Sequence, residues 1–93
     1  MASDDVRRLF GRKRTIEVLQ LLSDQGRLNY SEIETSIESS SDTISQSLAL
    51  LGEYSLVERH ERSSRDVQYK ITQKGTDLLE ALERIESVLA QDA

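Results

Sequence analysis

The sequence predicts a small α+β fold, mostly helical, in which a β-hairpin comes before a long last helix. Three observations predict it. Three helical stretches with separate apolar stripes come first, the apolar period then changes from 3.6 to 2 near Leu56, and a helical period returns after Thr72. At 93 residues, a single domain spanning 1–93 is expected.

Gly11 marks a possible break near the start of the first helical stretch, and the sequence leaves open whether it splits this helix or lies within it. Ser3, Asp4 and Asp5 provide a cap and an acidic first turn, so residues 1–10 are expected to form a helical N-terminal extension. The next stretch begins near Thr15 and ends at Gly26, a residue typical of helix C-caps. Its apolar face consists of Ile16, Val18, Leu19, Leu21 and Leu22.

Two short helices are expected next, joined by a serine-rich turn. Ser31 and Glu34 have the spacing of a capping box, which predicts that the first of them begins at Ser31. The second is expected to begin near Ser41 and Asp42. Their buried stripes are Ile33 with Ile37, and Ile44 with Leu48 and Leu51. Two helices joined by a tight turn form a helix-turn-helix unit.

The rest of the chain predicts a hairpin and a helix. Residues 56–61 and 67–71 have a strand pattern on either side of a polar turn at 62–66, and Thr72 is expected to cap a helix over 73–91. This order of elements is a winged helix-turn-helix, with a three-helix core, a β-hairpin wing and a long C-terminal helix.

The composition argues against several functional classes. Without cysteine and with one histidine, His60, the chain offers no usual metal-ligand set, so no metal and no cofactor are expected. The serines have no glycine elbow and no second histidine, so an enzyme is not expected either. No apolar run has the roughly 20 residues of a membrane span and no signal peptide is evident, so a cytoplasmic protein without a membrane partner is expected.

Charge is distributed unevenly along the chain. The formal net charge is −5, yet nine of the 12 cations fall in two short stretches, 7–14 and 59–70. Residues 28–58 contain no lysine or arginine. The protein is therefore acidic with two basic islands, which permits a nucleic-acid partner despite the net charge. A lysine-poor, acidic surface is also what a salt-rich cytoplasm favours.

Several segments resemble the HxlR and MarR families of winged-helix transcriptional regulators, especially small archaeal members. They are Gly11-Arg12-Lys13-Arg14-Thr15-Ile16-Glu17-Val18-Leu19, Leu28-Asn29-Tyr30-Ser31-Glu32-Ile33, Leu48 and Leu51 through Leu56-Val57-Glu58-Arg59, and Tyr69-Lys70-Ile71-Thr72-Gln73-Lys74-Gly75. The resemblance covers roughly residues 11–90. It implies a homodimer that binds operator DNA. Two departures are a third helix without basic residues and Ser55 where relatives often have glycine.

The third helix is the expected reader of the major groove. Gln46 is the favoured base reader because its amide can bond both N6 and N7 of adenine. Its expected companions are Ser41, Thr43, Ser45, Ala49 and Leu50. Asp42 and Glu53 on the same face would repel phosphates. The alternative is that this face is only solvated.

The two basic islands are the expected phosphate contacts. Arg62, Ser63, Ser64 and Arg65 form the wing tip, whose cations suit the minor groove or the backbone. The alternative is a charged tip that only keeps a sheet edge soluble. The range 12–14 holds Arg12, Lys13 and Arg14, which either contact flanking DNA or pair with acids such as Glu17.

The last helix is longer than a small domain needs to cover its core. Together with the N-terminal segment it is expected to form a homodimer interface. The interface residues are Leu78, Leu82, Ile85, Leu89 and Phe10. The alternative is that the whole stripe packs on the first helix of its own chain.

The function these observations predict is a homodimeric, sequence-specific transcriptional regulator that binds double-stranded DNA. No small-molecule ligand is indicated. The alternative is a winged-helix module for protein–protein interaction, favoured by the acidic middle of the chain and by an exposed Leu50. The sequence indicates neither the operator nor the direction of regulation.

Overall fold

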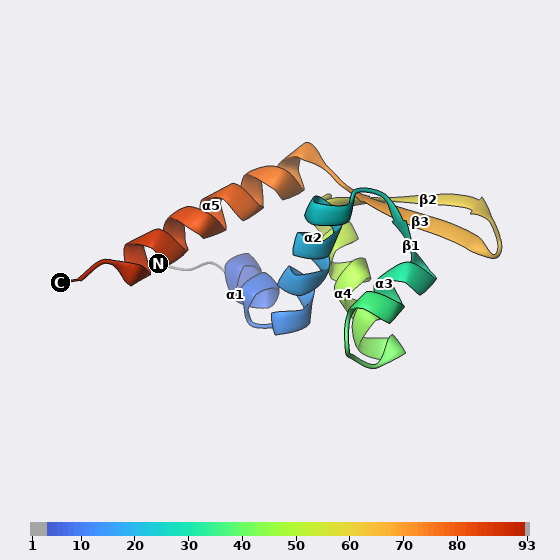
Figure 1. Ribbon diagram of the computed structural model, residues 1–93, viewed down its shortest axis with the longest axis horizontal. Coiled ribbons are helices and arrows are strands. Elements are labelled where there is room, and N and C mark those ends of the chain that lie inside the picture. Colours follow the sequence, from blue (N-terminus) through green and yellow to red (C-terminus); the bar gives the residue numbers. More distant parts are fainter. Residues whose placement is uncertain (1–3, 93) are drawn as a thin grey trace.

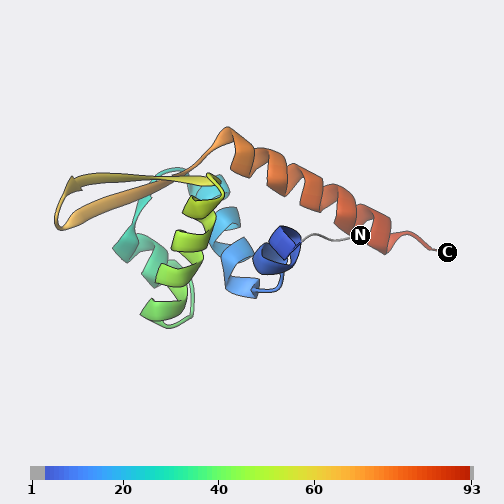
Figure 2. The same ribbon diagram turned by 180° about the vertical axis from the view of Figure 1, so that it is seen from behind.

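The structure, a computed structural model, describes residues 4–92 and has the winged-helix architecture that the sequence predicts. Figures 1 and 2 show the helical core with the wing extending on one side and the last helix on the other. The elements are α1 (Asp4–Phe10), α2 (Lys13–Gln25), β1 (Leu28–Asn29), α3 (Tyr30–Ser36), α4 (Ser41–Glu53), β2 (Val57–Ser63), β3 (Asp66–Ile71) and α5 (Gln73–Ala90). The molecule is elongated, with principal extents of 52 × 23 × 22 Å.

The wing belongs to a three-stranded antiparallel sheet with strand order β1-β3-β2. The hairpin is confirmed, and its turn is reduced to Ser64 and Arg65 because both strands extend further than the polar stretch 62–66 suggests. β1 was not predicted. Its two residues are too few to show a period, and they pair with Tyr69 and Gln68 in the middle of β3.

Two helix ends have the capping residues that the sequence predicts, whereas α2 begins at Lys13, two residues before the predicted Thr15. Gly26 ends α2 with φ 81, and the Thr72 side chain accepts a hydrogen bond from the Gly75 N–H at the start of α5. The predicted start at Ser31 is wrong. The N-cap of α3 is Asn29, which forms a reciprocal capping box with Glu32. Ser3, the predicted cap of α1, lies outside the described residues.

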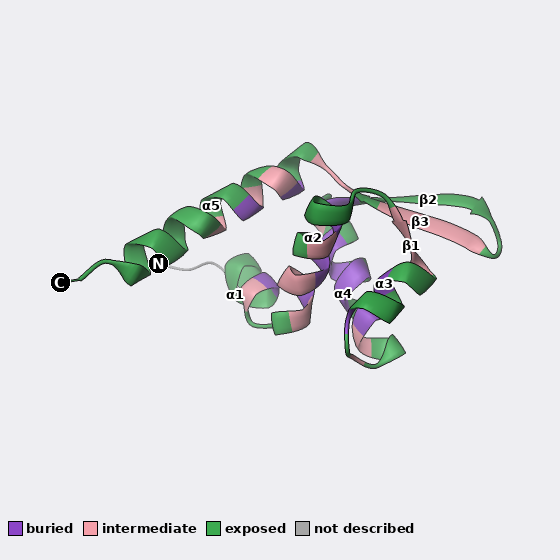
Figure 3. Cartoon of the chain, in the orientation of Figure 1, coloured by how far each residue is buried: buried purple, intermediate pink, exposed green. Residues whose placement is uncertain are grey.

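The core lies between α2, α3 and α4 (Figure 3). Leu19, Leu22, Ile33, Ile44 and Leu51 are fully buried there. Within this apolar cluster, the Thr15 hydroxyl of α2 donates a hydrogen bond to the Ser47 hydroxyl of α4 at 3.4 Å. Because both hydroxyls are buried and bonded to each other, this pair fixes how the start of α2 sits against the middle of α4.

The segment after α4 positions α5. Ser55 has φ 59, a left-handed conformation that favours glycine, and its carbonyl accepts a hydrogen bond from the Thr72 hydroxyl at 2.7 Å. Gly75 lies so close to the Leu56 carbonyl that a β-carbon would clash with it. The Lys74 ammonium also donates to the Tyr54 carbonyl at 2.8 Å. These contacts therefore hold the first turn of α5 against residues 54–56, which follow α4.

Candidate nucleic-acid interface

The start of α4 is held by one tyrosine hydroxyl of α3. Tyr30 Oη donates to the Ser41 carbonyl oxygen at 2.9 Å and lies 2.9 Å from the hydroxyls of both Ser41 and Ser45. The Ser40 hydroxyl caps the helix by accepting from the Thr43 backbone N–H at 3.1 Å. These bonds fix the helix that the sequence predicts to be the DNA reader.

The exposed face of α4 carries most of the predicted reading residues. Its exposed members are Ser41, Asp42, Ser45, Gln46, Ala49, Gly52 and Glu53. Thr43 is only half-exposed, and its hydroxyl lies 2.8 Å from that of Ser40. The exposed face of α4 therefore carries polar or small side chains and contains no lysine or arginine.

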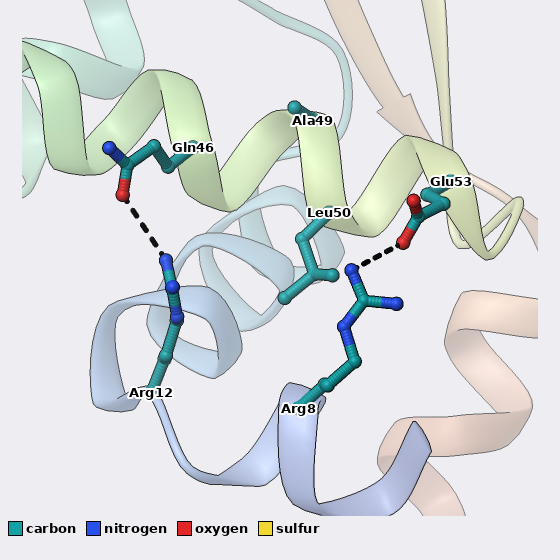
Figure 4. A pocket seen from close by; sticks show the side chains of 6 residues that line it. All are labelled: Arg8, Arg12, Gln46, Ala49, Leu50 and Glu53. Carbon is teal, nitrogen blue, oxygen red and sulfur yellow. Dashed lines mark hydrogen bonds and ion pairs between the residues drawn. The ribbon is translucent and has the colours of Figure 1, made fainter. Parts of the chain in front are cut away.

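The expectation of an exposed Leu50 is wrong. Leu50 is only 9% exposed and belongs to the same hydrophobic cluster as Leu9 of α1. On a helix of 3.6 residues per turn, Leu50 lies at the edge of the polar face, where a docked neighbour decides whether it is exposed. Here α1 and the start of α2 cover that edge (Figure 4).

Two arginines from outside α4 flank the same edge. Arg8 Nη2 lies 2.9 Å from Glu53 Oε2, and Arg12 Nη1 donates to Gln46 Oε1 at 3.2 Å (Figure 4). The four side chains, together with Ala49 and Leu50, line a hollow of about 290 Å³. The Glu53 carboxylate raises the pKa of Arg8 above its ordinary value. One of the two acids expected to repel phosphates is therefore paired with a cation.

Arg59 flanks the opposite edge of α4, and the sequence reasoning did not select it as a contact. It lies opposite Tyr69 in the β2–β3 pair, and a hydrogen bond with the Tyr69 side chain raises the pKa of Arg59. Both side chains line a hollow with Ser45, Ala49 and Gly52 of α4. The signal for it was the strand alternation, since Arg59 lies two residues after the buried Val57 and so shares its face.

The wing tip presents one cation without an internal partner. Arg62 Nε lies 3.8 Å from Asp66 Oδ2, whereas no ion pair within residues 4–92 involves the Arg65 side chain. Arg65 and Ser64 line a hollow of about 350 Å³ together with Arg59, Tyr69 and the start of α3. The space between the wing and the start of α3 is thus bordered by Arg59 and Arg65. Ser63 is the last residue of β2 and does not line this hollow.

The cluster at residues 12–14 is divided between its two predicted roles. Lys13 Nζ lies 3.9 Å from Glu17 Oε1, and Arg14 Nη1 donates to the same oxygen at 2.7 Å. Arg12 points instead toward α4. Exposed pairs contribute little to stability, so Lys13 can exchange Glu17 for another anion, whereas the pair between Arg14 and Glu17 is part-buried.

The apolar stripe of α5 is only partly covered by its own chain. Leu79 is buried, and Phe10, Leu78 and Leu82 pack partly against the core. Beyond them, Ile85, Val88 and Leu89 are 50%, 62% and 78% exposed. Of the predicted interface residues, Ile85 and Leu89 therefore remain uncovered, and the outer half of α5 extends away from the core (Figure 1).

Two further features of the described residues concern function, the grouping of their metal-ligating side chains and the apolar length of their helices. Among residues 4–92, no group of three or more histidine, cysteine, aspartate or glutamate side chains is arranged to hold a metal ion. In the same range, no helix combines the length and apolar character that crossing a membrane requires.

Comparison with known proteins relates this architecture to bacterial and archaeal regulators. The model of the HxlR-like helix-turn-helix family matches residues 9–92. A possible HxlR family transcriptional factor from Thermoplasma volcanium is 33% identical, with a TM-score of 0.69 over 94% of this chain and 83% of that one. The transcriptional regulator YodB from B. subtilis, in its reduced form, is 25% identical, with a TM-score of 0.75 over 94% and 90%.

A more distant structure shares the fold alone. A mutant MarR from E. coli, complexed with operator DNA, is 19% identical, with a TM-score of 0.69 over 77% of this chain and 53% of that one. No curated protein sequence matches the chain.

Proposed function

The chain belongs to the HxlR-like helix-turn-helix family of DNA-binding transcriptional regulators, and we propose that it binds a specific operator as a homodimer. The exposed face of α4 enters the major groove, and the wing lies on the backbone or in the minor groove. The observation that carries this proposal is the arginine border of that face, with Arg59 on one side and Arg8 and Arg12 on the other.

The small side chains of α4 support close approach to base edges. Ser45 and Ala49 are exposed and lie between the flanking arginines, so nothing bulky holds the helix away from the groove. Ala49 suits contact with a thymine methyl group, and the Gln46 amide suits a base edge. Since phosphate neutralisation dominates affinity, Arg65 and Arg59 supply the charge that α4 lacks. Arg59 Nη1 lies 3.4 Å from Glu61 Oε2, an exposed pair of the kind that contributes little, so a phosphate can replace the carboxylate.

The outer half of α5 supports the dimer. Ile85, Val88 and Leu89 form an exposed apolar stripe, and α5 is fastened to the end of α4 through Gly75 and Thr72. A second copy covering this stripe would hold two α4 helices at a fixed separation. In this proposal residues 1–93 are one domain, with 1–10 as its extension and 73–91 as its dimerisation helix. Such dimers bind half-sites about 34 Å apart.

Selection from random duplexes at several salt concentrations tests the proposal. The expected outcome is an enriched two-fold symmetric motif, with half-sites about one helical turn apart and an affinity that falls steeply with salt. No enriched motif at any salt concentration would overturn it. In that case the acidic, cation-free stretch 28–58 would favour the protein-interaction alternative, although Leu50 offers it no exposed apolar contact.

A further inference from the structure

The side chain of Gln46 is held by a residue from another helix. Gln46 lies on the exposed face in the middle of α4, and its Oε1 accepts a hydrogen bond from Arg12 Nη1 at 3.2 Å. In Figure 4 the amide nitrogen of Gln46 points away from the guanidinium. Because a guanidinium has only donors, the amide oxygen must face Arg12 and the NH₂ group must face away.

The backbone position of Arg12 is fixed by the packing beneath it. Arg12 is the N-cap of α2, and its carbonyl accepts a hydrogen bond from the Thr15 backbone N–H at 3.2 Å. Thr15 is fully buried and hydrogen-bonded to Ser47, the residue that follows Gln46. One buried bond between α2 and α4 therefore brings the N-cap of α2 beside the candidate base reader.

This orientation changes what Gln46 can recognise. The bidentate pair with adenine needs the amide oxygen to accept from N6 and the amide nitrogen to donate to N7. The bond from Arg12 occupies one lone pair of the oxygen and turns the carbonyl toward α2, so the group that Gln46 presents away from Arg12 is the NH₂ donor, which the N6 amino group of adenine cannot accept from. Guanine offers two acceptors, O6 and N7, at the same edge.

We propose that Arg12 is a specificity-determining positioning residue, which turns the Gln46 amide so that it reads guanine rather than adenine at one position of each half-site. This inference rests on the proposed function, since it assigns a base to the same α4 face. It adds a role to Arg12 beyond phosphate contact. The base preference is then set jointly by α2 and α4.

The test compares wild-type protein with Arg12→Ala on the selected operator, with each of the four bases placed in turn at the contacted position. Arg14→Ala is the matched control, because it removes the same charge two residues away while its side chain is bonded to Glu17 instead. We expect the wild type to prefer guanine over adenine about tenfold, which is the lower part of the range for a good base contact. Arg12→Ala should lose or reverse this preference, and Arg14→Ala should keep it.

A second variant, Gln46→Ala, distinguishes an effect of Arg12 that acts through Gln46 from a direct contact between Arg12 and the base. In the Gln46→Ala background, adding Arg12→Ala should leave the base preference unchanged. If it still changes the preference, Arg12 reads the base itself and the proposal is wrong. If Arg12→Ala alone keeps the wild-type preference, the inference is also wrong, but the proposed function stands. If the wild type binds no duplex above background, both this inference and the proposed function are wrong.

Discussion

Replacing Leu89 with glutamate should dissociate the dimer without unfolding the chain. Leu89 is 78% exposed near the C-terminal end of α5, so in an isolated subunit the new carboxylate would remain in water. In the proposed dimer the same carboxylate would be buried against the partner's apolar stripe. Leu89→Glu therefore separates assembly from folding.

The magnitude follows from the exposed fractions. Full burial of a side chain of this size is worth about 2 kcal/mol, so losing Leu89 from both copies removes roughly 3 kcal/mol. The three exposed residues of α5 together provide roughly 8 kcal/mol in a dimer, against an association cost of about 4–15 kcal/mol. Because about 1.4 kcal/mol corresponds to a factor of ten, a loss of roughly 3 kcal/mol should raise the dimer dissociation constant at least about 100-fold.

Sedimentation velocity across a concentration series measures this change. The wild type should sediment as a dimer at concentrations where Leu89→Glu sediments as a monomer, and both should have the same far-ultraviolet circular dichroism. Ser87→Glu is the control, because it adds the same charge on the opposite side of α5. A monomeric wild type, or a Leu89→Glu variant that dimerises as tightly as the wild type, would refute the reasoning.

Three further substitutions test other parts of the account. Gly75→Ala should lower the free energy of unfolding by about 2 kcal/mol in urea titrations, because its β-carbon would meet the Leu56 carbonyl; an unchanged midpoint would contradict this packing. Arg59→Ala should weaken binding to all duplexes and reduce the salt slope by about 1, as fluorescence anisotropy can measure. Arg65→Ala should do the same without changing stability, and unaltered slopes for both variants would exclude these phosphate contacts.

The order of elements was predictable because it depends on local patterns. A change of apolar period from 3.6 to 2 marks the wing, and the Thr72 side chain caps α5 as its position suggests. Capping was less decisive at α3, where Asn29 with Glu32 and Ser31 with Glu34 have the same spacing. The chain uses the first pair, and only the structure distinguishes them.

The residues that sequence reasoning missed depend on contacts between distant segments. β1 exists because Leu28 pairs with Tyr69, and two residues have no period of their own. Arg59 became a candidate only once the strand register placed it beside α4. Leu50 lies at the edge of the polar face of α4, so its burial is decided by α1. The ion pair between Arg8 and Glu53 has the same origin.

The central claim is that the face bordered by α4, Arg59 and the wing tip is the surface that contacts DNA. Titrating an isotope-labelled sample with the selected duplex and following backbone amide shifts tests it most directly. The account predicts that the large shifts fall on Ser45, Ala49, Gly52, Arg59 and Ser64, while the exposed stripe of α5 is unchanged. Shifts concentrated on α5 or on the opposite sheet face at Glu58, with α4 unaffected, would contradict it.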